Sequence, residues 1–138
     1  MIEISVRYEG DLHCLSIHGP SQATLSTDAP KDNLGKGEAF SPTDLTATSL
    51  GVCMLTTMAI VAQKKSLNVD LAGSKATVRK HMTSSAPRRI QKLEAIVEIP
   101  LPDSLVAREA LEDAALNCPV ALSLHPDVEK AVTFRWSG

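Results

Sequence analysis

The stretch FSPTDLTATSLGVCMLTTMAIVA, Phe40–Ala62, carries a single charged side chain and marks the start of a helix. Ser41 suits an N-cap, Pro42 the first helical position and Asp44 the capping-box position. We therefore expect a helix from Pro42 to about Lys64–Lys65, where lysine charges favour the negative end of the helix dipole. Because it is almost uncharged, this helix should be the central one and be buried on most sides.

Alternating apolar and polar residues on both sides of this helix predict strands. Before the helix we expect three strands, at residues 2–10, 12–19 and 22–27, and then an aperiodic surface loop at 28–37. After it we expect two long strands at 69–82 and 88–101, a second helix at 104–117, a short helical turn after Pro119 and a closing strand at 128–136. The order predicts a single α+β domain over residues 1–138, with antiparallel sheets wrapped around central helices.

The composition narrows the class of function. Aromatic residues make up 3% of the chain, which disfavours stacking platforms for nucleic-acid bases. A formal net charge of −2 provides no electrostatic footprint for a polyanion, so we expect no nucleic-acid partner. The N-terminal MIEISVRYEGDLH lacks the apolar region of a secretory signal, and threonines interrupt the longest apolar stretch. These features predict a cytoplasmic protein with no membrane partner.

The chain has three cysteines, Cys14, Cys53 and Cys118. An odd number without a C-x-x-C pair or Cys/His zinc spacing indicates neither a secreted disulfide framework nor a metal site. His13, His18 and His125 have no acidic or histidine neighbour at metal-ligand spacing, and no phosphate loop, G-x-S-x-G elbow or H-E-x-x-H helix occurs. Thiol chemistry is the reactive chemistry that remains.

Cys53 has two interpretations. At 3.6 residues per turn it shares a helix face with Ser49, Leu50, Thr56 and Thr57, a semi-polar stripe in an apolar helix. Threonine hydroxyls can bond back to the preceding turn, and free cysteines are commonly buried, so packing explains this stripe as well as chemistry does.

Cys118 stands in a different context. Pro119 is well placed at the first position of a new helix, which makes Cys118 a possible N-cap whose thiolate the free N–H groups would stabilise. An inert thiol at a helix junction is the open alternative. On spacing alone, Cys118 is expected to be the more activated thiol and Cys53 the more buried one. Cys14 lies in a predicted strand, and we interpret it as structural.

Two phrases taken together, FSPTDLTATSLGVCMLTTMA in the long helix and ALNCPVALSLHP after the second, resemble the osmotically inducible protein C and organic hydroperoxide resistance (OsmC/Ohr) family. The resemblance covers nearly the whole chain. It implies an intertwined homodimer and a thiol-dependent peroxidase that reduces hydroperoxides in oxidative-stress defence, without metal or bound cofactor. Carried over, Cys53 is the peroxidatic thiolate and Cys118 the resolving thiol, the reverse of the order from spacing. An external dithiol reductant would restore both thiols.

The sequence departs from the family pattern at the groups that activate the thiol. Thr43 stands where the family has a glutamate, and the neighbouring Asp44 lies about 180° around the helix from Cys53. Arg88 and Arg89 are the candidate thiolate-stabilising cations, with a solvated strand end as the alternative interpretation.

Leu50, Met54 and Met58 are candidate pocket walls for an organic peroxide, although such residues are equally typical of a plain core. Two other functions stay open for the OsmC fold: a redox sensor, or a small apolar ligand-binding protein with little peroxidase turnover. A thiol-dependent hydrolase or transferase is a third, less supported function, because no histidine can be paired with Cys53 from the sequence.

Overall fold

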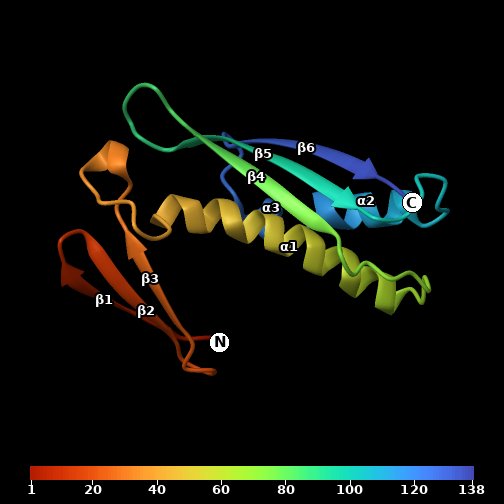
Figure 1. Ribbon diagram of the computed structural model, residues 1–138, viewed down its shortest axis with the longest axis horizontal. Helices are drawn as coiled ribbons and strands as arrows, with labels where there is room; N and C mark the ends of the chain where they lie inside the picture. The colour runs from red at the N-terminus through yellow and green to blue at the C-terminus, as the bar shows by residue number, and fades with distance from the viewer. The chain divides into compact units, whose positions relative to one another are not determined.

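The computed structural model describes all 138 residues and has an α+β architecture, as predicted (Figure 1). In chain order, the elements are β1 Ile4–Gly10, β2 His13–His18, β3 Thr24–Asp28, a 3₁₀ helix Lys31–Asn33, α1 Pro42–Lys64, β4 Lys75–Met82, β5 Ile90–Ile99, α2 Arg108–Leu116, α3 Pro119–Ser123 and β6 Glu129–Trp136. The chain divides into two compact units, Met1–Thr46 and Ala47–Gly138, which we describe separately.

The first unit is an antiparallel sheet in the order β1-β2-β3, so the three predicted strands are confirmed. Asp11 and Leu12 form the tight turn between β1 and β2 with φ of 50° and 61°, directly after Gly10 at φ 92°. Two successive residues with positive φ match the twist of a two-residue hairpin. The turn therefore brings the end of β1 beside the start of β2.

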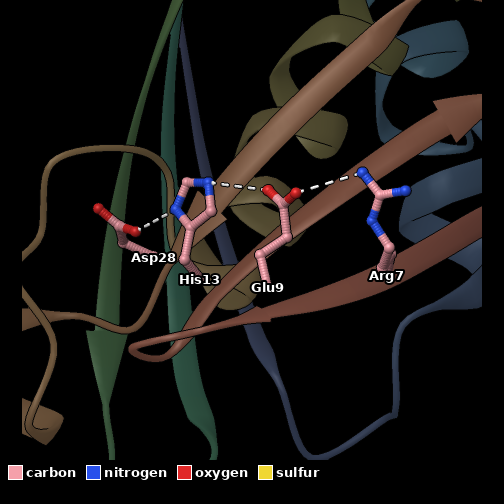
Figure 2. Close-up of polar contacts among 4 residues, drawn as sticks. All are labelled: Arg7, Glu9, His13 and Asp28. Carbon is pink, nitrogen blue, oxygen red and sulfur yellow. Dashed lines mark hydrogen bonds and ion pairs between the residues drawn. The ribbon is translucent and has the colours of Figure 1, made fainter.

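A row of ionic side chains crosses one end of this sheet, as Figure 2 shows. A hydrogen bond of 2.6 Å joins His13 Nδ1 to Asp28 Oδ1, and His13 Nε2 lies 3.6 Å from Glu9 Oε1. The other oxygen of Glu9 pairs with Arg7 at 3.2 Å. The contact of His13 with Asp28 was not predicted from the sequence, because Asp28 reaches His13 only through the pairing of β2 with β3.

Asp28 also closes the loop that precedes α1. Its Oδ2 accepts the Glu38 N–H at 2.9 Å, and its own N–H donates to the Phe40 carbonyl at 3.2 Å. The hydrogen bond from His13 is the main cause that holds the pKa of Asp28 below its usual value, against the effect of burial. The end of the loop is thus tied back to Asp28 through both its carboxylate and its backbone N–H.

The predicted capping box at the start of α1 is confirmed. Ser41 Oγ accepts the Asp44 N–H at 3.1 Å, and Asp44 Oδ2 accepts the Ser41 N–H at 2.9 Å. Both interactions satisfy backbone donors that a helix start would otherwise leave unpaired.

α1 buries one face and exposes another. Leu50, Met54 and Met58 are at most 1% exposed, whereas Val52 and Ile60 are 58% and 43% exposed. The expected burial on most sides is therefore not met within one chain. α1 is also long and apolar enough to cross a membrane by length and composition, which the sequence analysis did not expect, but core helices of soluble proteins pass the same test.

The second unit contains a mixed sheet in the order β4-β5-β6, and α1 runs along it (Figure 1). β4 and β5 are antiparallel, but β5 and β6 are parallel, which corrects the expectation of purely antiparallel sheets. The physical reason is the connection: α2 and α3 form a crossover between β5 and β6, and a crossover returns the chain in the same direction.

The core of this unit lies between α1 and the sheet. From β5 it includes the fully buried Leu93, Val97 and Ile99, and Leu111 joins them from α2. A Cβ added at Gly51 of α1 would lie 3.0 Å from the Val78 side chain of β4. Helix and sheet are therefore in close contact at the middle of α1, where Cys53 lies.

Two predicted boundaries were wrong. β4 begins at Lys75 rather than at residue 69, because the Asp70 side chain accepts the Ala72 N–H in a local turn and Gly73 has φ 85°. α2 begins at Arg108 rather than at residue 104, after two turns closed by backbone bonds from Leu105 and Arg108. In both places local turn bonds replace the predicted periodic element.

Candidate active site

Two free thiols from separate segments meet in the second unit. Cys53 is half-buried near the middle of α1, and Cys118 is fully buried at the junction of α2 and α3. The two thiols lie close enough for each to shift the pKa of the other. The fold therefore brings together the two cysteines that the resemblance pairs.

The surroundings of Cys53 favour its thiolate. Burial is the largest single effect on the pKa of Cys53 and raises it. Three hydrogen bonds act the other way, first from the Val120 N–H and then from the Thr57 hydroxyl and the Cys118 thiol. Together they hold the pKa of Cys53 below its ordinary value.

The surroundings of Cys118 have the opposite net effect. Burial raises the pKa of Cys118, and the hydrogen bond and negative charge of Cys53 raise it further. Backbone N–H groups of Ala121 and Val120 lower it only in part. The pKa of Cys118 is therefore above its ordinary value, and Cys118 remains the protonated partner when Cys53 ionises.

The ranking of the two thiols from spacing is wrong on both points. Cys118 does occupy the N-cap position of α3, where the Ala121 and Val120 N–H groups lower its pKa, but burial outweighs them because the residue is 0% exposed. Cys53 is the less buried thiol and the one with the lowered pKa. The reason is that the Val120 N–H in the first turn of α3 also reaches Cys53, across from α1.

The structure does not bring the candidate cations to Cys53 within one chain. Arg88 and Arg89 are exposed in the segment between β4 and β5, after Pro87. Arg89 donates to the Ile90 carbonyl at 3.0 Å. Neither arginine is among the groups that shift the pKa of Cys53.

Thr43, which stands at the position of the expected glutamate, contacts another side chain at the start of α1. The hydroxyl of Thr43 lies 3.2 Å from the hydroxyl of Ser41, at the start of α1. Asp44 belongs to the capping box, as the sequence analysis expected. Both side chains therefore take part in the start of the helix.

The three candidate pocket residues lie on the buried side of α1. Leu50 and Met54 are in the hydrophobic core, and Met58 also lines a cavity of about 680 Å³. This cavity extends along Leu55, Ala59 and Ala62 to the loop at 66–74. Leu55 lies about 200° around the helix from Cys53, so the cavity opens on a different face of α1 from the thiol pair.

No group of three or more histidine, cysteine or acidic side chains is arranged to hold a metal ion. The hydrogen-bond donors around Cys53 that the sequence analysis did not assign are the Val120 N–H and the Thr57 hydroxyl. Thr57 could have been found, since it is one helical turn from Cys53. Val120 could not, because its position depends on how α3 packs.

Comparison with known proteins shows the family to which the chain belongs. Residues 35–132 match the family described as OsmC-like protein, which is well over half of the chain. The chain belongs to the OsmC-like family. None of the curated proteins compared matches the sequence.

Solved structures of OsmC-like proteins extend the match to almost the whole chain. A protein from Psychrobacter arcticus 273-4, described provisionally as an osmotic stress induced and detoxification response protein, is 42% identical, with a TM-score of 0.89 over 98% of this chain and 96% of that one. The organic hydroperoxide resistance protein OsmC of Legionella pneumophila is 16% identical, with a TM-score of 0.76 over 98% and 96%. At that identity the second likeness shows the fold alone.

A third structure has a ligand. It is provisionally described as an organic hydroperoxide resistance protein of Vibrio cholerae, with captopril bound in one of its active sites. It is 18% identical, with a TM-score of 0.75 over 97% of this chain and 90% of that one. The OsmC-like fold of this chain is thus shared with proteins named for hydroperoxide resistance.

Proposed function

We propose that this OsmC-like protein is a thiol-dependent peroxidase that reduces organic hydroperoxides in oxidative-stress defence. The observation that carries the proposal is the asymmetric thiol pair: Cys53 has a lowered pKa, and the neighbouring Cys118, which shares its surroundings at the start of α3, has a raised one. A peroxidatic thiol must be a thiolate to attack, whereas a resolving thiol can stay protonated until it is used. The two surroundings match these two roles.

The proposed cycle needs only the two thiols, the peroxide and an external dithiol. The Cys53 thiolate attacks the distal peroxide oxygen, the O–O bond breaks, and the alkoxide leaves and takes up a proton to become the alcohol. Cys53 is then a sulfenic acid, and Cys118 displaces water from it to form a disulfide. Exchange with the external dithiol reduces the disulfide and oxidises the dithiol.

Oxidation mapping tests this proposal. Reduced protein is treated with one equivalent of cumene hydroperoxide, alkylated and digested without reduction, and its peptides are identified by mass spectrometry. We expect a Cys53–Cys118 linked peptide, with Cys14 fully alkylated as the internal control thiol. Two freely alkylated thiols at Cys53 and Cys118 would contradict the peroxidase proposal.

We also propose that the protein is a homodimer. Its apolar surface supports this: Ile4, Val6 and Tyr8 of β1 are 60%, 66% and 62% exposed, and Val52 of α1 is 58% exposed. An exposed apolar strand next to unpaired backbone groups is a typical association surface. Arg88 and Arg89 remain the proposed cations, supplied to Cys53 of one subunit by its partner.

Light scattering tests the dimer. We expect a solution mass of twice the 14.7 kDa of the chain. Val6→Asp should shift the mass towards that of one chain, because it places a charge in the apolar surface of β1. Glu3→Asp, a change beside β1 that keeps the charge, is the control. A wild-type mass of 14.7 kDa would contradict the dimer proposal.

A reducing compartment such as the cytoplasm suits this chemistry, because all three cysteines are free thiols. The second candidate function, binding of a small apolar ligand, is favoured by the cavity along Met58 and Ala62. Oxidation mapping separates the two, since ligand binding requires no disulfide. Slow turnover with a stable disulfide would favour a redox sensor over a peroxidase.

A further inference from the structure

Three threonine hydroxyls of α1 contact an atom four residues back in the helix, but their partners are of two kinds. Thr56 Oγ1 donates to the Val52 carbonyl at 2.8 Å, and Thr46 Oγ1 donates to the Pro42 carbonyl at 3.4 Å. Both bonds reach four residues back, which is the usual structural behaviour of threonine inside a helix. Such bonds explain these two residues without chemistry.

Thr57 differs from these two threonines. Its Oγ1 lies 3.7 Å from the sulfur of Cys53, which is also four residues back, so its partner is a thiol rather than a carbonyl. A thiolate has no proton to donate, so when Cys53 is ionised the hydrogen must come from Thr57. A hydrogen bond to a charged acceptor is stronger than one to its neutral form, so this contact favours the thiolate.

We propose that Thr57 is a catalytic residue, whose hydroxyl donates to the Cys53 thiolate and stabilises it with a neutral donor. This assignment rests on the proposed peroxidase function for its role in turnover, but not for its effect on the thiol. The contact lies between two residues of one helix, so it is present in a single chain whatever a partner subunit adds. Thr57 is half-buried beside the reacting sulfur.

Three groups from different parts of the second unit then lower the pKa of Cys53. They are the Val120 N–H of α3, the Thr57 hydroxyl of α1 and the thiol of Cys118 at the junction before α3. None of the three carries a positive charge. The arrangement gives a physical account of how Cys53 can ionise although Thr43 occupies the family's glutamate position.

The test is the pH dependence of alkylation at each cysteine in the full-length protein. Iodoacetamide rates are measured from pH 5 to pH 10 with mass-spectrometric readout of Cys53 separately from Cys14 and Cys118. Thr57→Val removes the hydroxyl and keeps the branched shape, and Thr57→Ser restores a hydroxyl. Thr56→Val is the matched control, because it removes a neighbouring threonine hydroxyl that contacts only a carbonyl.

We expect Thr57→Val to move the alkylation profile of Cys53 to higher pH, so that alkylation on the acidic side of the profile slows, by about tenfold for a move of one pH unit. At pH values above the pKa of Cys53 in both the wild type and Thr57→Val, the two alkylation rates should converge, since Cys53 is then ionised in both proteins. Thr57→Ser and Thr56→Val should keep the wild-type profile. A wild-type profile for Thr57→Val, or an equal shift in Thr56→Val, would overturn the assignment.

The alkylation experiment and the oxidation mapping can give opposite results, so the Thr57 proposal and the peroxidase proposal are tested independently. If Thr57→Val shifts the profile but the wild-type protein forms no Cys53–Cys118 link with cumene hydroperoxide, the peroxidase proposal falls and the thiolate contact stands. If the link forms but the profile does not move, the contact falls and the peroxidase proposal stands.

Discussion

Replacement of Cys53 by alanine is expected to abolish hydroperoxide consumption, with a loss on the order of 10³-fold or more, as for removal of other attacking nucleophiles. Cys53 is half-buried, and alanine is smaller and favours helix, so the variant should fold. The measurement is the rate of cumene hydroperoxide loss with excess dithiothreitol as the external dithiol. Unchanged consumption by Cys53→Ala would contradict the assigned attack.

The other two cysteines provide the controls for this variant. Cys14→Ala should keep the full rate, since Cys14, on β2, is not among the groups that shift the pKa of Cys53 or Cys118. Cys118→Ala should still reduce the first equivalent of peroxide and then slow, with Cys53 accumulating as sulfenic acid. The opposite pattern, in which Cys118→Ala loses the first equivalent and Cys53→Ala keeps it, would reverse the two roles.

The position of Cys53 on a helix could be predicted because its signals are local. Ser41, Pro42 and Asp44 define a helix start within four residues, and the structure has the capping box that they predict. By contrast, the relative reactivity of Cys53 and Cys118 depends on where the N–H groups of α3 point. No spacing along the chain carries that information, and the N-cap rule alone therefore favoured Cys118, the thiol whose pKa is raised.

The limits of the strand predictions have a similar physical origin. Alternation of side chains identified the strand β6, but it is the same for parallel and antiparallel pairing, so it could not show that β6 runs parallel to β5. Alternation also continued through Val69 and Leu71, where the Asp70 side chain forms a turn instead. The contact of His13 with Asp28 depends on strand register in the same way.

The resemblance to the OsmC/Ohr family supplied what local patterns could not, and the family match confirms it over residues 35–132. It paired two distant cysteines that the fold does bring together. It did not supply the groups that lower the pKa of Cys53 in this chain, because Val120 acts through its backbone and Thr57 through a hydroxyl. These belong to this chain's own packing.

Leu50→Ala is expected to reduce the free energy of unfolding by about 2–5 kcal/mol, the usual range for a buried leucine. Leu50 is 0% exposed and belongs to the core shared by α1, the sheet and α2. The sequence left it open whether Leu50 is a pocket wall or core. Its complete burial favours core, so the variant should lose stability through the cavity it leaves, while its thiols keep their order of reactivity.

Urea unfolding at one fixed protein concentration is the measurement, because the stability of a dimer depends on concentration. Val106→Ala is the matched control: Val106 is fully exposed, and its truncation should change stability by less than about 0.5 kcal/mol. A pocket wall would behave differently, since its truncation would weaken binding of a large peroxide and leave unfolding nearly unchanged. A Leu50→Ala variant with wild-type stability and a raised KM for cumene hydroperoxide would therefore place Leu50 in the substrate pocket instead.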